Sequence, residues 1–180
     1  LEEIEAWSYE AGREEDPTRT AFNLGRARDP RATPALLEVA SNSGAPTRDR
    51  VLALDLLARI DDRDVVEQLV PLLDDSAGTV ATHAALALLD MRDHRGAELA
   101  RFALFDEDPA VRDRAAIALA RLGYDDGFED LIEALGRDDL HTREEAIRAL
   151  GRLRDSRARE ALEAALVDER TRYLAVLALG

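Results

Sequence analysis

Three apolar positions recur along this chain at a fixed interval of 31 residues, and this regularity limits its fold more than any other feature. The series begins with Ala53, Leu57 and Ile60. Three successive steps of 31 give Ala84, Leu88 and Met91, then Ala115, Leu119 and Leu122, then Ala146, Leu150 and Leu153. Residue type and spacing are both kept in four blocks, which predicts a repeat protein whose units stack on their neighbours.

Each block predicts a helical hairpin. The spacing of four and then three residues places the three apolar side chains on one stripe of a helix. A turn containing aspartate follows, and then a second, shorter apolar helix, as at Val65, Val66, Leu69 and Leu73. We expect the acidic joints between hairpins to cap the N-termini of the next helices. These joints are Asp74-Asp75, Asp106-Glu107-Asp108-Pro109 and Asp138-Asp139.

The prediction is therefore an all-α fold, a single α-solenoid over 1–180 with about five hairpins. The approximate repeats are 13–44, 45–75, 76–106, 107–137 and 138–168, with partial helices at 1–12 and 169–180. The last stretch, 172–180, matches 143–151 at an offset of 29 and ends apolar. Because terminal repeats usually carry a polar cap, we expect the chain to be part of a longer protein.

Composition narrows the function classes. Hydrophobic residues make up 46% of the chain and aromatic residues 4%, so the core is built mostly from Ala and Leu. The absence of cysteine excludes disulfides, zinc–thiolate sites and cysteine nucleophiles. The formal net charge is −14 and every one of the 24 basic residues is arginine. We therefore rank nucleic-acid binding last, predict no membrane span, and hypothesise a cytoplasmic, salt-adapted (halophile) home for this acidic chain.

The run Asp108-Pro109-Ala110-Val111-Arg112, followed by Ala115-Ala116, Leu119 and Leu122-Gly123, resembles the short HEAT-like repeats named for phycobilisome lyases. The resemblance implies a solenoid of HEAT-like hairpins whose second helices line the concave face. It also implies a choice of activities, because proteins that look like this include bilin-lyase subunits, scaffolds and adaptors. More distant HEAT-like folds include DNA-repair glycosylases.

No convincing catalytic set is visible. The three histidines, His83, His94 and His141, form no metal-ligating pair at helical spacing. Phosphate-binding and nucleophile motifs are missing as well. We therefore predict no catalytic residue, no metal site and no cofactor, and regard an enzymatic role as doubtful.

The second helices carry the main candidate site. Glu67, Glu98 and Glu129 are spaced by the repeat, so we expect them to stack into an acidic row. Further carboxylates continue that row at Asp130, Glu133, Glu160 and Glu163. Such a face would attract a basic partner. The alternative is that these side chains merely form a solvated surface.

Two phenylalanines interrupt the acidic row. Phe102 is a candidate anchor for a partner if its ring is exposed. We expect Phe105 to be buried, filling the space left by the neighbouring small residues Ala97, Ala100 and Ala103.

Arginines and aspartates also recur with the repeat. We interpret Arg112, Arg143 and Arg172 as structural, tying neighbouring repeats together. The turn aspartates Asp62, Asp93 and Asp155 are interpreted in the same way. Arginines flank two turns, at Arg26, Arg28 and Arg31 and at Arg152, Arg154, Arg157 and Arg159. This basic edge could bind an acidic partner, although we favour pairing with Glu160, Glu163 and neighbouring acids.

The sequence thus predicts a non-enzymatic scaffold or adaptor that binds another protein, through a basic segment, along its acidic concave face. A bilin-lyase-like enzyme subunit is the first alternative, and a HEAT-type nucleic-acid-binding repair protein the second. Oligomeric state and the partner's identity do not follow from these patterns.

Overall fold

The computed structural model describes residues 16–180, and these residues form α-helices and short 3-10 helices without any strand. The chain divides into two compact units, Leu1–Gly96 and Ala97–Gly180, which are described separately. The predicted helix over Leu1 to Ala11, with Leu1, Ile4 and Trp7 on one face, lies outside the described residues.

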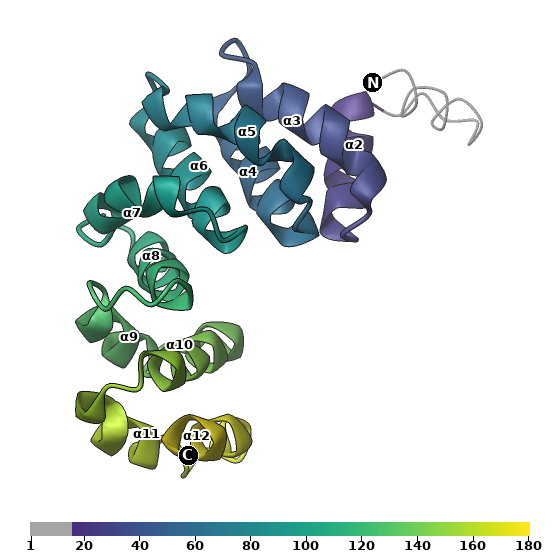
Figure 1. Ribbon diagram of the computed structural model, residues 1–180. Coiled ribbons are helices and arrows are strands. Elements are labelled where there is room, and N and C mark those ends of the chain that lie inside the picture. Colours follow the sequence, from purple (N-terminus) through teal and green to yellow (C-terminus); the bar gives the residue numbers. More distant parts are fainter. Residues whose placement is uncertain (1–15) are drawn as a thin grey trace. The chain divides into compact units, whose positions relative to one another are not determined.

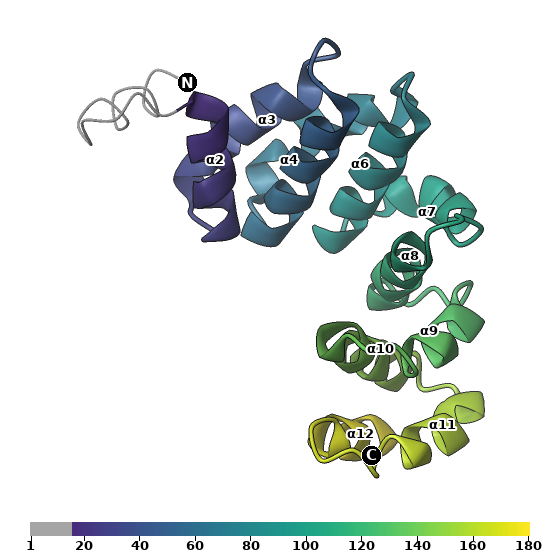
Figure 2. The same cartoon turned by 180° about the vertical axis from the view of Figure 1, so that it is seen from behind.

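In the first unit, α2, α4 and α6 pack side by side, and α3 and α5 cover them as a second layer (Figures 1 and 2). The α-helices are α2 (Pro17–Arg26), α3 (Thr33–Ser41), α4 (Thr47–Ile60), α5 (Val66–Leu69) and α6 (Gly78–Asp90). The 3-10 helices are η1 (Pro30–Ala32), η2 (Arg63–Val65), η3 (Val70–Asp74) and η4 (His94–Gly96).

The second unit repeats this two-layer arrangement. The helices α8, α10 and α12 pack in succession, and α7, α9 and α11 form the other layer (Figures 1 and 2). The elements are α7 (Ala97–Ala103), α8 (Pro109–Arg121), α9 (Phe128–Ala134), α10 (Leu140–Leu153), η5 (Ser156–Ala158), α11 (Arg159–Ala164) and α12 (Arg172–Leu179). We call α2, α4, α6, α8, α10 and α12 the first helices, and α3, α5, α7, α9 and α11 the second helices.

The first two periodic positions of each block lie in the core, whereas the third is fully buried only at Met91. The alanine and leucine of every block are buried. They are Ala53, Leu57, Ala84, Leu88, Ala115, Leu119, Ala146 and Leu150. Small alanines let helices approach closely while the leucines fill the space between the layers. The fold is thus the predicted all-α solenoid of hairpins. The repeat boundaries and the single continuous solenoid over 1–180 stay predictions.

Every first helix from α2 to α10 ends in the left-handed conformation. The residues with positive φ are Arg28, Asp61, Arg92, Gly123 and Arg154, and from Asp61 onward they are 31 residues apart. A left-handed residue ends a helix by turning the chain back toward its last carbonyls, and glycine adopts it with least strain. Arginine occupies this position three times, so the chain accepts local strain at its turns.

At four of these five turns an aspartate follows the left-handed residue and stabilises the turn. The Asp62, Asp93 and Asp155 carboxylates accept from the main-chain N–H groups two residues on, at 3.1, 2.9 and 2.9 Å. Asp29 does the same at 3.0 Å. These bonds explain the recurrence of aspartate in the turns and support our structural interpretation.

Two glycines allow first and second helices to meet closely. A Cβ added at Gly127 would lie 2.6 Å from Ala116 Cβ. A Cβ at Gly96, one repeat earlier, would overlap the main chain of Ala85. Both positions therefore require glycine, because backbone atoms cannot move aside.

A recurring arginine binds the chain at each of the three joints of the second unit. Arg112 donates to the carbonyl oxygens of Asp106 and Glu107 at 2.8 and 3.2 Å, and Arg143 donates to that of Arg137 at 2.9 Å. Arg172 donates to the Leu166 carbonyl at 2.9 Å. These bonds to free carbonyls after a helix support the predicted structural role.

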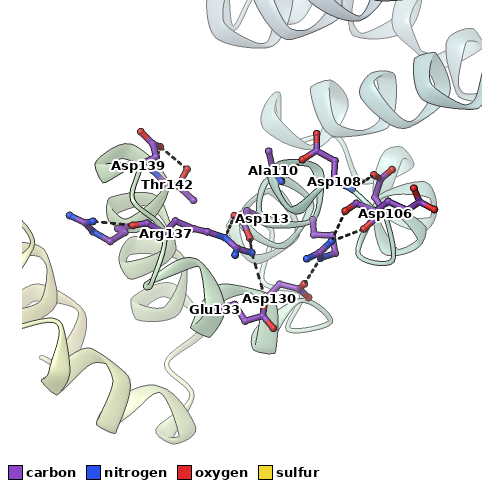
Figure 3. Close-up of polar contacts among 12 residues, drawn as sticks. Asp106, Asp108, Ala110, Asp113, Asp130, Glu133, Arg137, Asp139 and Thr142 are labelled. Carbon is purple, nitrogen blue, oxygen red and sulfur yellow. Dashed lines mark hydrogen bonds and ion pairs between the residues drawn. The ribbon is translucent and has the colours of Figure 1, made fainter.

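The acidic joints cap the following helices in two of three cases. Asp108 accepts from Ala110 N–H at 2.9 Å and Asp139 from Thr142 N–H at 2.8 Å (Figure 3). At the joint before α6 the expected cap is wrong, because the N-cap residue is Ala77. The Asp75 carboxylate instead accepts from Ala77 N–H and from Arg50.

Candidate interaction surface

Phe102 and Phe105 both point into solvent from α7 and the turn that ends it. Phe102 is 67% exposed and Phe105 is 86% exposed. The prediction that Phe105 would be buried is wrong. Ala97, Ala100 and Ala103 bring α7 close to its neighbours and are themselves buried, so they leave no space for a ring.

The neighbouring Arg101 is already engaged. Its guanidinium donates to the Asp126 carboxylate at 2.8 Å and lies over the Tyr124 ring, 4.8 Å from the ring centroid. This contact ties α7 to the turn before α9 and leaves the two phenylalanines without a cation above them among the described residues.

Three glutamates occupy equivalent exposed positions on the second helices of the second unit. Glu98, Glu129 and Glu160 follow one another at intervals of 31 residues, in the first turns of α7, α9 and α11. Within residues 16–180 none of them makes a hydrogen bond or an ion pair, and the same holds for the exposed Glu163. Their carboxylates therefore have no direct partner, although the charges of Arg101 and Arg157 act on Glu98 and Glu129.

Glu67, expected to begin this row, is neutralised within the first unit. Arg95 Nη2 donates to its Oε1 at 2.8 Å, and Nη1 donates to Oε2 at 3.2 Å. These bonds hold the pKa of the Glu67 carboxyl below its ordinary value. Arg95 also binds Asp93 at 2.7 Å. The Glu67 end of the row is thus an internal ion-pair network.

Asp130 and Glu133 stand among arginines. Asp130 is half-buried and lies 3.8 Å from Arg112, while Glu133 lies 3.6 Å from Arg137. Burial raises the pKa of the Asp130 carboxyl, and Glu133 adds to this effect. Arg137 also forms two bonds to the buried Asp113, at 2.8 and 3.1 Å (Figure 3). These two acids are partly compensated, unlike Glu98 and Glu160.

Of the four arginines around the turn at Arg154, only Arg157 forms an ion pair within residues 16–180. Arg157 donates to Asp155, holding the pKa of that carboxyl below its usual range, and lies 4.1 Å from the Phe128 ring centroid. Arg157 thus pairs with the neighbouring acids Asp155 and Asp125, and not with Glu160 or Glu163. Arg152, Arg154 and Arg159 are exposed and make no ion pair within residues 16–180.

The histidines are separated. His83 lies on α6, with Nδ1 2.9 Å from Asp55 Oδ1, while His94 lies in η4 and His141 in α10. In the described part of the chain, no three histidine or carboxylate side chains are grouped as a metal ion would require. No helix described there is long and apolar enough to cross a bilayer.

Comparison with known proteins agrees with this architecture. A family model of HEAT repeats matches residues 98–180. The chain has a HEAT-like repeat fold.

Solved structures show the same fold. An engineered protein is 23% identical with a TM-score of 0.58, over 91% of this HEAT-like protein and 88% of the other chain. The complex of CpcE and CpcF of phycocyanin lyase from Nostoc sp. PCC7120 is 18% identical with a TM-score of 0.52, covering 89% and 87% of the two chains. At this identity the likeness concerns the fold alone. A search of curated proteins gave no match.

One member of the arginine series in this HEAT-like protein escaped the sequence analysis. Arg50 donates to the Ala40 carbonyl at 2.9 Å and forms a two-bond ion pair with Asp75, while only 4% of the residue is exposed. It lies two repeats before Arg112, but position 81 between them is alanine, which hid the periodicity. A search at multiples of 31 would have found it.

Proposed function

We propose that this chain is a non-enzymatic module that binds another protein through the exposed second helices of residues 97–180. HEAT repeats generally mediate protein interactions, and a solenoid offers an extended surface instead of a single pocket. The likeness to phycocyanin lyase subunits is one of fold, and no residue described above supplies a reason to prefer lyase chemistry.

The observation that carries the proposal is the row formed by Glu98, Glu129 and Glu160. Each glutamate is exposed at an equivalent position and makes no hydrogen bond or ion pair among the described residues. In a chain with 24 arginines, most partly buried carboxylates already have an internal partner. The free row favours a partner segment that brings its own basic residues.

The first test reverses this row. The Glu98→Arg/Glu129→Arg/Glu160→Arg variant and the wild type are immobilised and incubated with native cytosol, and the bound proteins are identified by mass spectrometry. We expect a partner that the wild type retains and the variant loses, with retention by the wild type falling as salt rises.

A matched control changes the net charge equally away from the row. Asp61, Asp64 and Glu169 are exposed; Asp61 and Glu169 lie in turns and Asp64 lies in the 3-10 helix η2. Asp61→Arg is acceptable because arginine occupies the equivalent left-handed position at Arg92. The control should keep the partner. Equal retention by wild type and row variant would show that the acidic row is only a solvated surface.

A further inference from the structure

We propose that residues 98–108, here called the α7 docking site, bind a partner segment in which a large apolar side chain is flanked by arginine or lysine. This inference rests on the proposed function and names the chemistry of partner that one part of the second-helix surface receives.

The apolar component is the pair of phenylalanines. Phe102 and Phe105 lie close together in the sequence, at the end of one short helix, and both rings are mostly exposed. The buried side of α7 is formed by alanines, so neither ring is needed to fill the core. Exposed aromatic pairs are costly to keep in water, and aromatic side chains contribute most strongly at interfaces.

Carboxylates surround this pair. Glu98 precedes Phe102 by one helical turn, and the exposed Asp106, Glu107 and Asp108 directly follow Phe105. The side chains of Glu98 and Glu107 make no hydrogen bond or ion pair among residues 16–180. Asp106 and Asp108 accept from main-chain N–H groups, which leaves their charges in place.

The nearby cations do not balance these acids. Arg101 is bound to Asp126, and Arg112 donates to the main-chain carbonyls of Asp106 and Glu107. Negative charge therefore remains on both sides of the aromatic pair. A basic residue before and after an apolar anchor would meet this charge, and its cation could also lie over an exposed ring.

The same charges argue against a second copy of this chain as the occupant. A symmetric contact would bring the acids of one α7 docking site against those of the other. Like charges brought together in this way oppose association. An apolar partner without cations would leave the carboxylates unpaired, so it fits the site less well than a basic one.

The test measures peptide binding to the full chain by fluorescence anisotropy. The probe is a synthetic peptide with a central Trp-Leu pair flanked by arginines. One companion peptide carries glutamates in place of the arginines, and another carries serines in place of Trp-Leu. We expect the first peptide to bind at least about tenfold more tightly than either companion.

Protein variants locate the binding. The Phe102→Ser/Phe105→Ser variant should bind the first peptide at least about tenfold more weakly. The Glu98→Gln/Glu107→Gln variant should also bind it more weakly, and its affinity should depend less on salt. The matched controls are Tyr173→Ser, an exposed aromatic elsewhere, and Glu169→Gln, an exposed carboxylate in the turn before α12. Both should bind the peptide as the wild type does.

Three results would overturn the inference: no detectable binding by the wild type, unchanged binding by the phenylalanine variant, or equal binding of all peptides. Sedimentation showing a wild-type dimer that the phenylalanine variant loses would assign the site to self-association instead. If the peptide does not bind but the Glu98/Glu129/Glu160 variant loses its cytosolic partner, the proposed function stands and the partner has a different chemistry. If the peptide binds as expected but that variant keeps its partner, binding is confined to the α7 docking site.

Discussion

The two units bury the same repeat positions but differ in what they leave exposed. In residues 16–96 every large apolar side chain is at least half-buried, whereas residues 97–180 expose several. The exposed ones are Phe102, Phe105, Val167, Tyr173, Val176 and Leu177. In a repeat fold the residue types between the two layers are constrained by packing, whereas the residue types on the outer surface can vary from repeat to repeat. Differences in binding should therefore arise on the outer surface of the second unit.

The largest expected effect tests the shared core. Leu88→Ala in the first unit and Leu119→Ala in the second should each lower the free energy of unfolding by about 2–5 kcal/mol, because both leucines are fully buried. Urea unfolding followed by circular dichroism measures both. Phe105→Ala should change stability by less than about 0.5 kcal/mol. A large loss at one leucine and a negligible loss at the other would show that the two cores are not equivalent.

Next in size is the arginine series. Arg50→Ala should cost about 3 kcal/mol, because it leaves the nearly buried Asp75 carboxylate without its partner. Arg112→Ala in the second unit should cost about 1 kcal/mol, since Arg112 is more exposed and its acceptors are carbonyls that water can reach. Equal losses in the same urea assay would contradict this ranking.

The same pair gives a pH dependence with a defined sign. Hydrogen bonds from Arg50 hold the pKa of Asp75 below its ordinary value, so the unfolded chain binds this proton more readily. The stabilisation is complete above the unfolded pKa of about 4 and is lost as pH falls through the folded pKa. The difference in the free energy of unfolding between the wild type and Arg50→Ala should therefore shrink as the pH falls below about 4.

Glycine substitutions should give effects of opposite sign in the two units. Gly127→Ala should cost about 1–3 kcal/mol because its Cβ would overlap Ala116. Gly78→Ala, at the start of α6, meets nothing within 4 Å and should stabilise the first unit by about 0.5–1 kcal/mol. Thermal unfolding of both variants provides the comparison, and stabilisation by Gly127→Ala would show that the helices can separate without cost.

The smallest effect concerns the left-handed turns. Arg92→Gly should stabilise the first unit by about 0.5–1 kcal/mol, because glycine relieves the strain of positive φ. Gly123→Arg should destabilise the second unit by a similar amount. Since arginine is present at three such turns, Gly123→Arg should still fold normally. A loss of helical circular dichroism in that variant would disprove the equivalence of the turns.

The core was predictable because each hairpin repeats one local pattern. Ala115 and Leu119 are identified by their spacing alone, and the turn aspartates by their place after a helix. Surface charges were not predictable in this way. The state of Glu67 depends on Arg95, 28 residues later in another hairpin, and no local pattern connects them.

The exposure of Phe105 and the need for glycine at two positions were missed for a different reason. Residue size suggested that Phe105 would fill space among alanines, but alanines instead bring the backbones together and push the ring outward. The same close approach requires Gly96 and Gly127, whose 31-residue spacing was already visible in the sequence. Predicting either result needs the distance between helices, which depends on the whole set of contacting residues.

The arginine at the three joints of the second unit also bears on how such a chain could lengthen during evolution. Arg112, Arg143 and Arg172 each donate to main-chain carbonyls, which every amino acid possesses. A duplicated repeat would therefore bring a fastener that fits whatever residues precede it. Gene duplication within the coding sequence could add whole hairpins at once, with natural selection left to adjust only their outer surfaces.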